Sequence, residues 1–179
     1  MYPKQNDAYI WAAYETLMLV TFCMNILSLL DSQNVLPALE ANNKAEVLEK
    51  LVASLKGKVS DAEAEKILQA VQEREQIMST GVGKGLAIPH GKTPAIEQTY
   101  AAFAILKNPV EYDAIDQKPV KMVFLLAGPQ SSNSLHIKML SRISRLMNNR
   151  GFRERLLDCS TSEEIIAQFK AEDIVSLSG

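Results

Sequence analysis

The 179-residue sequence has few cysteines, few histidines and no excess of basic residues. Its only cysteines, Cys23 and Cys159, cannot build the framework of a disulfide-stapled mini-protein. A thiol content this low suits the reducing cytoplasm, which is the location we expect. Nineteen basic residues face 21 acidic ones, for a formal net charge of −2. Because a dedicated nucleic-acid binder usually carries a strong positive field, we expect no nucleic-acid partner.

A long membrane-spanning run is also missing. Residues 8–30 form the most apolar stretch, but its longest uncharged run, which ends at Leu30, is shorter than the ~20 apolar residues that cross a bilayer. It also lacks the basic leader of a secretory signal, so we expect no direct membrane insertion. We interpret residues 1–23 as a helical extension that packs on a partner or forms a homodimer, with a targeting segment as the alternative. The domain is then expected over residues 24–179.

Capping signals and the spacing of apolar residues predict four helices. They are expected over residues 43–57, 60–75 and 135–148, and from residue 161 onward. Nearly continuous apolar runs predict buried strands, which are expected over residues 86–88, 100–106 and 120–126. The glycines at positions 81, 83, 85 and 91 predict loops on either side of the first strand. Alternating helices and strands indicate an α/β fold, with a small mixed β-sheet sandwiched by helices.

The glycine-rich stretch does not fit a nucleotide-binding motif. Gly81, Gly83 and Gly85 lead into a strand, whereas the dinucleotide and P-loop motifs need a helix after the glycines, and no Gly-Lys-Ser/Thr is present. These glycines could instead let backbone N–H groups approach an anion. The two histidines lack the spacing of metal ligands and have no cysteine nearby. We therefore expect neither a metal nor a cofactor.

His90 is the first candidate for chemistry. It follows Pro89, which is expected to end the short strand, and it precedes Gly91, which adds little bulk beside the ring. Neutral imidazole is available near pH 7, so this position suits a nucleophile or an acid–base group. The alternative is an ordinary histidine on a surface loop.

His136 and Arg74 are the next candidates. His136 lies in the first turn of the predicted helix 135–148, where free N–H groups and the helix dipole favour a phosphate. The alternative is a hydrogen-bonded histidine at the edge of the core. Arg74 lies near the end of its helix, from which a guanidinium could reach an anion in the glycine loop. Alternatively, it is a solvated side chain paired with Glu73 or Glu75.

Three segments then point to a known family. They read REQIMSTGVGKGLAIPHGK (74–92), YDAIDQKPVKMVFLLAGP (112–129) and LHIKMLSRISRLM (135–147). Together they resemble the enzyme IIA domain of the phosphoenolpyruvate:sugar phosphotransferase system, fructose/mannitol type, which includes the nitrogen-regulatory enzyme IIA proteins. The resemblance covers about residues 24–172, and its S-T-G-x-G-x-G-x-A-x-P-H block is specific. Residues 1–23 have no counterpart in the pattern.

The resemblance implies a phosphotransferase that works through a phosphohistidine. His90 would accept a phosphoryl group from the phosphocarrier protein HPr through Nε2 and pass it to a cysteine of an enzyme IIB. His136 would contact the active site, and Arg74 would help to hold the phosphoryl group. At the loop entrance, the hydroxyls of Ser79 and Thr80 and the backbone of Gly81 are predicted to bind phosphate.

Two roles stay open. The first is a phosphocarrier in sugar uptake, and the second is a nitrogen-regulatory-type protein whose phosphorylation state controls binding to regulatory target proteins. Residues 79–81 and 89–92 favour the regulatory branch, whereas residues 127–129 favour the sugar branch. A basic run from Lys138 to Arg155 is either a solvated helix face or a docking surface for an acidic partner.

Overall fold

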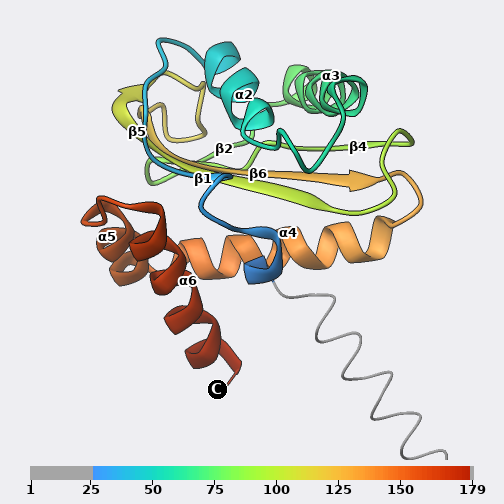
Figure 1. Ribbon diagram of the computed structural model, residues 1–179. Helices are drawn as coiled ribbons and strands as arrows, with labels where there is room; N and C mark the ends of the chain where they lie inside the picture. Colours follow the sequence, from blue (N-terminus) through green and yellow to red (C-terminus); the bar gives the residue numbers. More distant parts are fainter. Residues whose placement is uncertain (1–25, 178–179) are drawn as a thin grey trace, which may run out of the picture.

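A six-stranded mixed sheet forms the middle layer of the molecule, which a computed structural model describes over residues 26–177 (Figure 1). Its strands are β1 (Val35–Leu39), β2 (Gly81–Gly83), β3 (Leu86–Ala87), β4 (His90–Thr93), β5 (Tyr100–Val110) and β6 (Val120–Pro129). The strand order is β1-β5-β6-β3-β2, with β4 also beside β6. Strand β5 runs antiparallel to β6, whereas β1 is parallel to β5, and β3 and β4 are parallel to β6.

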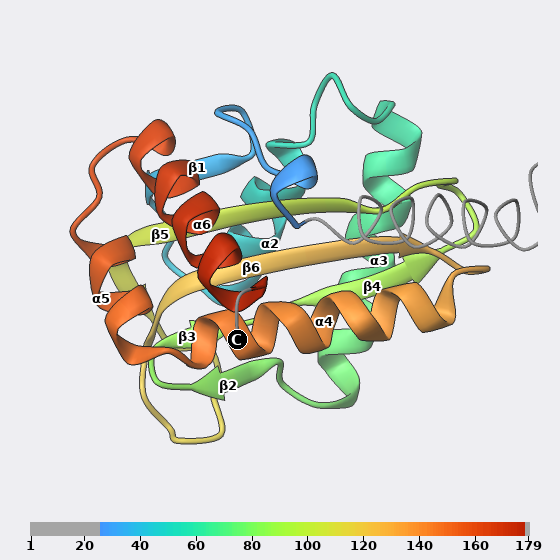
Figure 2. The ribbon, with the colours of Figure 1, turned by 90° about the horizontal axis from the view of Figure 1, so that it is seen from below.

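Helices cover both faces of this sheet (Figures 1 and 2). One face carries α2 (Lys44–Ala53) and α3 (Asp61–Ile77). The other carries the 3-10 helix η1 (Ile26–Leu29) together with α4 (Asn133–Asn148), α5 (Arg150–Leu157) and α6 (Ser162–Leu177). The predicted α/β fold with a mixed sheet between helices is confirmed.

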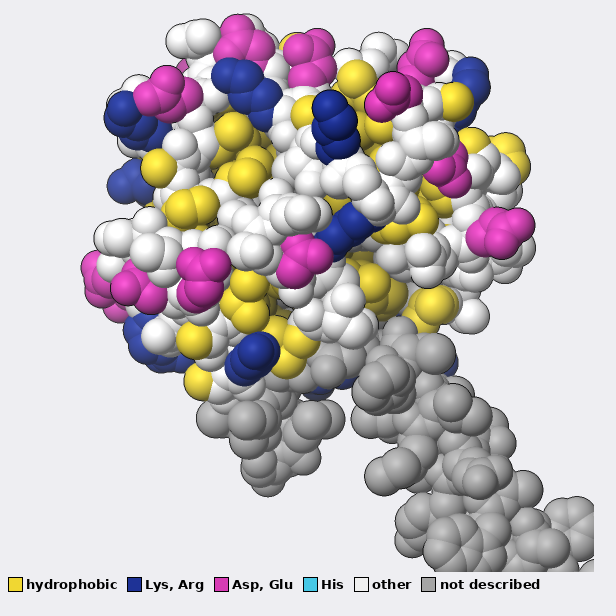
Figure 3. All heavy atoms as spheres, viewed as in Figure 1, with side chains coloured by type: hydrophobic (Ala, Val, Ile, Leu, Met, Phe, Trp, Pro, Cys, Tyr) yellow, Lys and Arg dark blue, Asp and Glu magenta, His cyan; other side chains and the backbone are white. Residues whose placement is uncertain are grey.

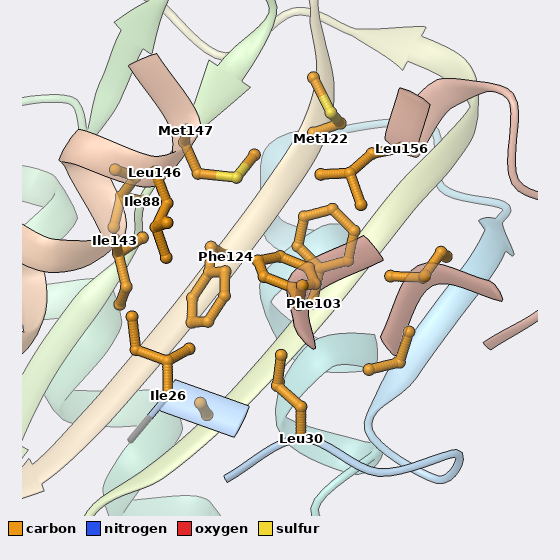
Figure 4. Close-up of a cluster of buried hydrophobic side chains, with 14 of the residues drawn as sticks. Ile26, Leu30, Ile88, Phe103, Met122, Phe124, Ile143, Leu146, Met147 and Leu156 are labelled. Atoms are coloured by element: carbon orange, nitrogen blue, oxygen red, sulfur yellow. The ribbon is translucent and has the colours of Figure 1, made fainter. Parts of the chain in front are cut away.

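The two central strands divide the core into two halves. Their side chains alternate between the faces, as the pleat of a strand requires. Toward α4, α5 and α6 point Ala101, Phe103, Ile105, Met122, Phe124 and Leu126. Toward α2 and α3 point Ala102, Ala104, Leu106, Val123, Leu125 and Ala127. The first half is aromatic, because the rings of Phe103 and Phe124 lie close to the ring of Phe169, with centroids 5.2 and 5.9 Å apart. Figure 4 shows Phe103 and Phe124 among the other side chains of this half. The second half is mainly aliphatic, and the sheet contributes Ala102, Ala104 and Ala127 to it.

Local capping explains where the first two long helices begin. The Asn43 side chain accepts a hydrogen bond from the backbone N–H of Glu46, and Ser60 and Glu63 form a reciprocal capping box. Helix α2 ends at Ala53, earlier than the predicted end at Gly57. Gly57 lies in the following turn with a φ of +88°, a conformation that favours glycine.

The glycine-rich stretch is more ordered than predicted. Where we predicted loops, residues 81–83 form β2 and residues 90–93 form β4. Strand β4 pairs with β6 from His90 opposite Leu126 to Thr93 opposite Pro129. Only Ile88 and Pro89 separate it from β3, which confirms that the proline interrupts the strand.

The N-terminal predictions concern residues 1–25, which lie outside the described residues. The expected helical extension, the homodimer and the boundary at residue 24 therefore stay predictions. Among residues 26–177, every helix is too short or too polar to cross a membrane.

Candidate active site

His90 is held by a backbone hydrogen bond that selects its tautomer. As the first residue of β4, it lies with its Nδ1 atom 2.8 Å from the backbone carbonyl oxygen of Ile88. A carbonyl oxygen can only accept, so Nδ1 carries the proton. In the neutral ring, Nε2 then keeps its lone pair, and this nitrogen is available as a nucleophile.

The surroundings of His90 keep the ring neutral. Burial lowers the pKa of this half-buried imidazole, and the positive charge of Arg74 lowers it further. The hydrogen bond to Ile88 and the negative charge of Glu75 oppose this shift without cancelling it. The neutral ring, which has a proton on Nδ1 and a free lone pair on Nε2, therefore prevails at pH 7.

His136 lies beside His90 in the first turn of α4. The two ring centroids are 5.9 Å apart, and the ring planes meet at 50°. The side chain fits because Gly128 has no Cβ atom, since a Cβ there would lie 2.7 Å from Nδ1 of His136. Burial, with the charges of His90 and Lys92, lowers the pKa of His136 to about 4. The ring is therefore neutral and carries a single N–H group.

Both ring nitrogens of His136 are buried without a hydrogen-bond partner among the described residues. Buried polar groups are almost always paired, and an orphaned donor costs on the order of 1–3 kcal/mol. An unpaired N–H beside a nucleophile is therefore suited to a ligand that brings its own acceptor oxygens.

Arg74 completes this group from the helix layer. It lies three residues before the end of α3 and, with His90 and His136, lines an open pocket of about 430 Å³ that we call the histidine pocket. Its Nη1 atom donates to the carbonyl oxygen of Met78 at 2.9 Å, which uses only one of its several N–H donors. Lys92 brings a second cation to the same pocket, where its Nζ atom bonds to Asn133. The pocket thus combines two cations and two neutral imidazoles with one carboxylate, Glu73, and the cations favour anion binding.

A second glycine brings α3 close enough for this arrangement. Around Gly91 the helix backbone lies so close that an added Cβ atom would be 2.8 Å from atoms of Ala70 and Val71. The strand that carries His90 therefore packs directly against the helix that carries Arg74. No histidine side chain is visible on the face shown in Figure 3.

The predicted phosphate ligands of the loop lie elsewhere. The Ser79 hydroxyl donates to the carbonyl oxygen of Tyr112 at 2.8 Å and accepts from the backbone N–H of Gly81 at 3.1 Å. The backbone N–H and the hydroxyl of Thr80 donate to Glu75. The structure does not bring these three residues to the lining of the histidine pocket. Their assignment to phosphate binding stays a prediction.

Sequence reasoning missed the roles of Gly128 and Lys92. Gly128 follows a predicted strand, and its closeness to His136 depends on the return of the chain through α4. Lys92 follows the Pro-His-Gly triplet. Its position two residues after His90 could have predicted that it lines the same pocket.

Part of the predicted basic surface is used inside the molecule. Arg150 pairs with Glu154 at 2.8 Å and Arg155 with Glu172 at 2.6 Å. Arg153 donates to the carbonyl oxygens of residues 147 and 148 at the end of α4. Arg153 and Arg155 thus connect α5 to neighbouring helices, and Arg150 pairs within α5, which weakens the interpretation of the whole run as a docking surface.

The α/β sandwich, with two histidines and an arginine lining one pocket, agrees with the arrangement that the resemblance to enzyme IIA domains implies. The family described as "Phosphoenolpyruvate-dependent sugar phosphotransferase system, EIIA 2" matches residues 28–172. The chain belongs to this family.

Relatives of two kinds share this assignment. A nitrogen regulatory protein of Bradyrhizobium diazoefficiens is 35% identical over 74% of this chain and 86% of its own length. A fructose-specific EIIABC component of Bacillus subtilis is 34% identical over 80% of this chain, but this match spans only 22% of that longer protein. The crystal structure of the nitrogen regulatory protein IIA-Ntr of Neisseria meningitidis superposes with a TM-score of 0.74 at 30% identity, over 80% of this chain and 98% of its own.

Proposed function

We propose that this protein is a phosphocarrier that accepts a phosphoryl group from phospho-HPr on Nε2 of His90 and passes it to an enzyme IIB. The observation that carries the proposal is the hydrogen bond from Nδ1 of His90 to the Ile88 carbonyl, which directs the lone pair of Nε2 away from the backbone. His136 and Arg74 line the same pocket, where they can contact the oxygens of the phosphoryl group.

In the first transfer, the lone pair of His90 Nε2 attacks the phosphorus of the phosphorylated imidazole of HPr. The new P–N bond forms as the donor P–N bond breaks, and the electron pair of the broken bond returns to the imidazole of HPr. Phosphoryl transfer through a loose transition state depends mainly on in-line positioning and on charge stabilisation. Arg74 supplies positive charge, and the unpaired N–H of His136 supplies a donor for a phosphoryl oxygen.

In the second transfer, a cysteine thiolate of enzyme IIB attacks the phosphorus on His90. The P–Nε2 bond breaks, and its electron pair returns to the ring. Nδ1 keeps its proton and its hydrogen bond to the Ile88 carbonyl throughout, so His90 needs no change of tautomer between the two steps. The name of the Bacillus relative joins the A component to B and C components, which supports an enzyme IIB as the acceptor. Exchange with HPr would take place in the cytoplasm.

The second candidate is a regulatory protein whose phosphorylation state decides which target proteins it binds. Relatives named nitrogen regulatory protein, two of them matched over most of their length, favour this role. Both candidates use the same phosphohistidine. They differ in what happens next, because a carrier loses the phosphoryl group to enzyme IIB, whereas a regulator keeps it long enough to change its binding.

The proposal is tested by incubating the purified protein with phosphoenolpyruvate, enzyme I and HPr. We expect the intact mass to rise by a single phosphoryl group that acid removes, and we expect His90→Ala to abolish the gain. His136→Ala is the matched control, because it removes the other histidine and should still allow slow labelling. Labelling of the His90→Ala variant at the wild-type rate would contradict the proposal. Adding purified enzyme IIB to the phosphorylated protein then separates the carrier from the regulator.

A further inference from the structure

A buried carboxylate lies behind the histidine pocket and takes no direct part in it. Glu75 follows Arg74 in α3, but its side chain is only 5% exposed and does not line the histidine pocket. Both of its carboxylate oxygens lie 3.1 Å from the backbone nitrogen of Thr80, and Oε2 accepts a 2.5 Å bond from the Thr80 hydroxyl. The carboxylate thus binds Thr80 through two different donors.

Thr80 connects this carboxylate to the nucleophile. Its carbonyl oxygen accepts a hydrogen bond of 3.0 Å from the backbone N–H of Ile88. The carbonyl of Ile88 in turn accepts the 2.8 Å bond from Nδ1 of His90. One continuous series of hydrogen bonds therefore runs from Glu75 through two backbone segments to the imidazole. Because Thr80 is held at its N–H, its hydroxyl and its carbonyl, it has little freedom to move Ile88.

The charge of Glu75 is balanced from the opposite side. The Lys44 ammonium lies 3.2 Å from Oε1 of Glu75 and 2.8 Å from Oδ2 of Asp113. A buried carboxylate without a partner would be strongly unfavourable, so Lys44 compensates the burial of Glu75 beside Thr80. An ionised carboxylate accepts shorter and stronger hydrogen bonds than an amide oxygen does.

We infer that Glu75, acting through Thr80 and Ile88, is a positioning residue that fixes the tautomer and the orientation of His90 for phosphoryl transfer. The kinetic part of this inference rests on the proposed function, whereas the part that concerns the tautomer does not. Second-layer groups of this kind hold a reacting ring in place through hydrogen bonds, as partners of metal-bound histidines do. If the Ile88 carbonyl is displaced, the proton of the neutral ring is free to move to Nε2, and that nitrogen loses its nucleophilic lone pair.

Two variants each change one partner of the hydrogen bond between Glu75 and Thr80. Glu75→Gln replaces the carboxylate with an amide of the same shape, and Thr80→Val removes the hydroxyl while keeping the size of the side chain. We expect each to slow phosphoryl transfer from phospho-HPr by about tenfold, below the ~100-fold effect of a 1 Å misplacement of a reacting group. Thr80→Ser keeps the hydroxyl and should restore most of the rate. Glu65→Gln is the matched control, because Glu65 is an exposed residue of the same helix.

Histidine ¹⁵N NMR supplies a readout that needs no phosphoryl donor. In the wild type we expect His90 to be protonated on Nδ1, and in Glu75→Gln and Thr80→Val we expect a measurable fraction protonated on Nε2. His136→Gln identifies the signals of the second ring. Thermal unfolding of each variant separates loss of fold from loss of position, and if Glu75→Gln fails to fold, Thr80→Val carries the test alone.

The outcomes distinguish the two proposals. A shift of the tautomer together with a slower transfer supports the positioning role. If the folded variants keep the wild-type tautomer and rate, even with a lower melting temperature, Glu75 is only structural and the inference is overturned. If the tautomer shifts but the wild type accepts no phosphoryl group, the positioning of the ring stands and the proposed function fails.

Discussion

Two pockets lie on either side of α3, and they differ in whether their polar side chains have partners. The histidine pocket holds His136, whose two buried ring nitrogens lack partners among the described residues. The second pocket, lined by Lys44, Glu75 and Asp113 among others, is here called the lysine pocket. In it, the lysine contacts both carboxylates, so its charges satisfy one another.

This difference favours the histidine pocket as the ligand site of the proposed function. A polar group that stays unpaired in the interior destabilises the fold unless something else completes it. The lysine pocket completes its own interactions, and so it serves stability and positioning. The histidine pocket combines a buried, unpaired imidazole with two cationic side chains, and in the proposed function a phosphoryl group on His90 would supply acceptor oxygens to them.

The largest expected effect is a loss of phosphoryl-transfer rate, which we expect from changes in the histidine pocket and not in the lysine pocket. We expect Arg74→Ala and His136→Ala each to slow phosphoryl acceptance about 100-fold, the cost of removing one donor from a transition state. Stopped incubation with phospho-HPr followed by intact mass measures this rate. Lys66→Ala, at an exposed position on α3 away from the pocket, is the control and should transfer at the wild-type rate. Equal rates in all three variants would show that the histidine pocket does not hold the phosphoryl group.

The second prediction concerns stability and belongs to the lysine pocket. We expect Lys44→Met to lower the free energy of unfolding by about 2 kcal/mol, because it leaves the buried Glu75 without its cation. The phosphoryl transfer rate should change by less than about threefold, since the bonds from Thr80 to Glu75 remain. Urea unfolding measures the first quantity and the phosphorylation assay the second.

A double variant sharpens this test. Lys44→Met combined with Glu75→Gln removes both charges, and the double-mutant cycle isolates their interaction. We expect the double variant to lose less unfolding free energy than the two single variants lose when their losses are added. A slowing by Lys44→Met as large as that by Arg74→Ala would mean that the two pockets act as one site.

Much of the fold follows from local patterns in the sequence. The capping residues Asn43 and Ser60 and the continuous apolar runs of β5 and β6 were sufficient to predict their elements. Strand β1 was missed because it has only five residues and contains Pro37, which normally weakens a strand. Helix α5 was missed because a single residue, Asn149, both ends α4 and begins α5.

The candidate site also contains residues that local sequence patterns identify and residues whose contacts depend on tertiary packing. His90, His136 and Arg74 were identified from motif segments, and the structure brings all three to one pocket. Glu75 appeared in the sequence only as an alternative ion-pair partner of Arg74. Its contact with Lys44, 31 positions earlier in the chain, depends on how α2 packs on α3, and no local pattern encodes that contact.

The third prediction uses the low pKa of His136, which is about 4 in the folded protein against a reference value of 6.5. Between these values the unfolded chain binds a proton that the folded protein does not, so stability falls as pH falls through this window. We expect the free energy of unfolding to drop by about 2 kcal/mol between pH 7 and pH 5 from this residue alone. His136→Gln should remove that part of the slope in urea titrations. An unchanged slope would mean that His136 is not buried in its neutral form.

The smallest predicted effect tests how closely the histidine pocket is fitted. In Gly128→Ala, the new Cβ atom would lie 2.7 Å from Nδ1 of His136, so the ring must shift by several tenths of an ångström. We expect phosphoryl acceptance to slow about tenfold, because transfer depends steeply on the position of its donors. Gly151→Ala is the matched control, since the nearest atoms to its added Cβ are 3.6 Å away. If Gly128→Ala transfers as fast as this control, the position of His136 is not critical, and the unpaired nitrogens of the histidine pocket would reflect loose packing instead of preparation for a phosphoryl group.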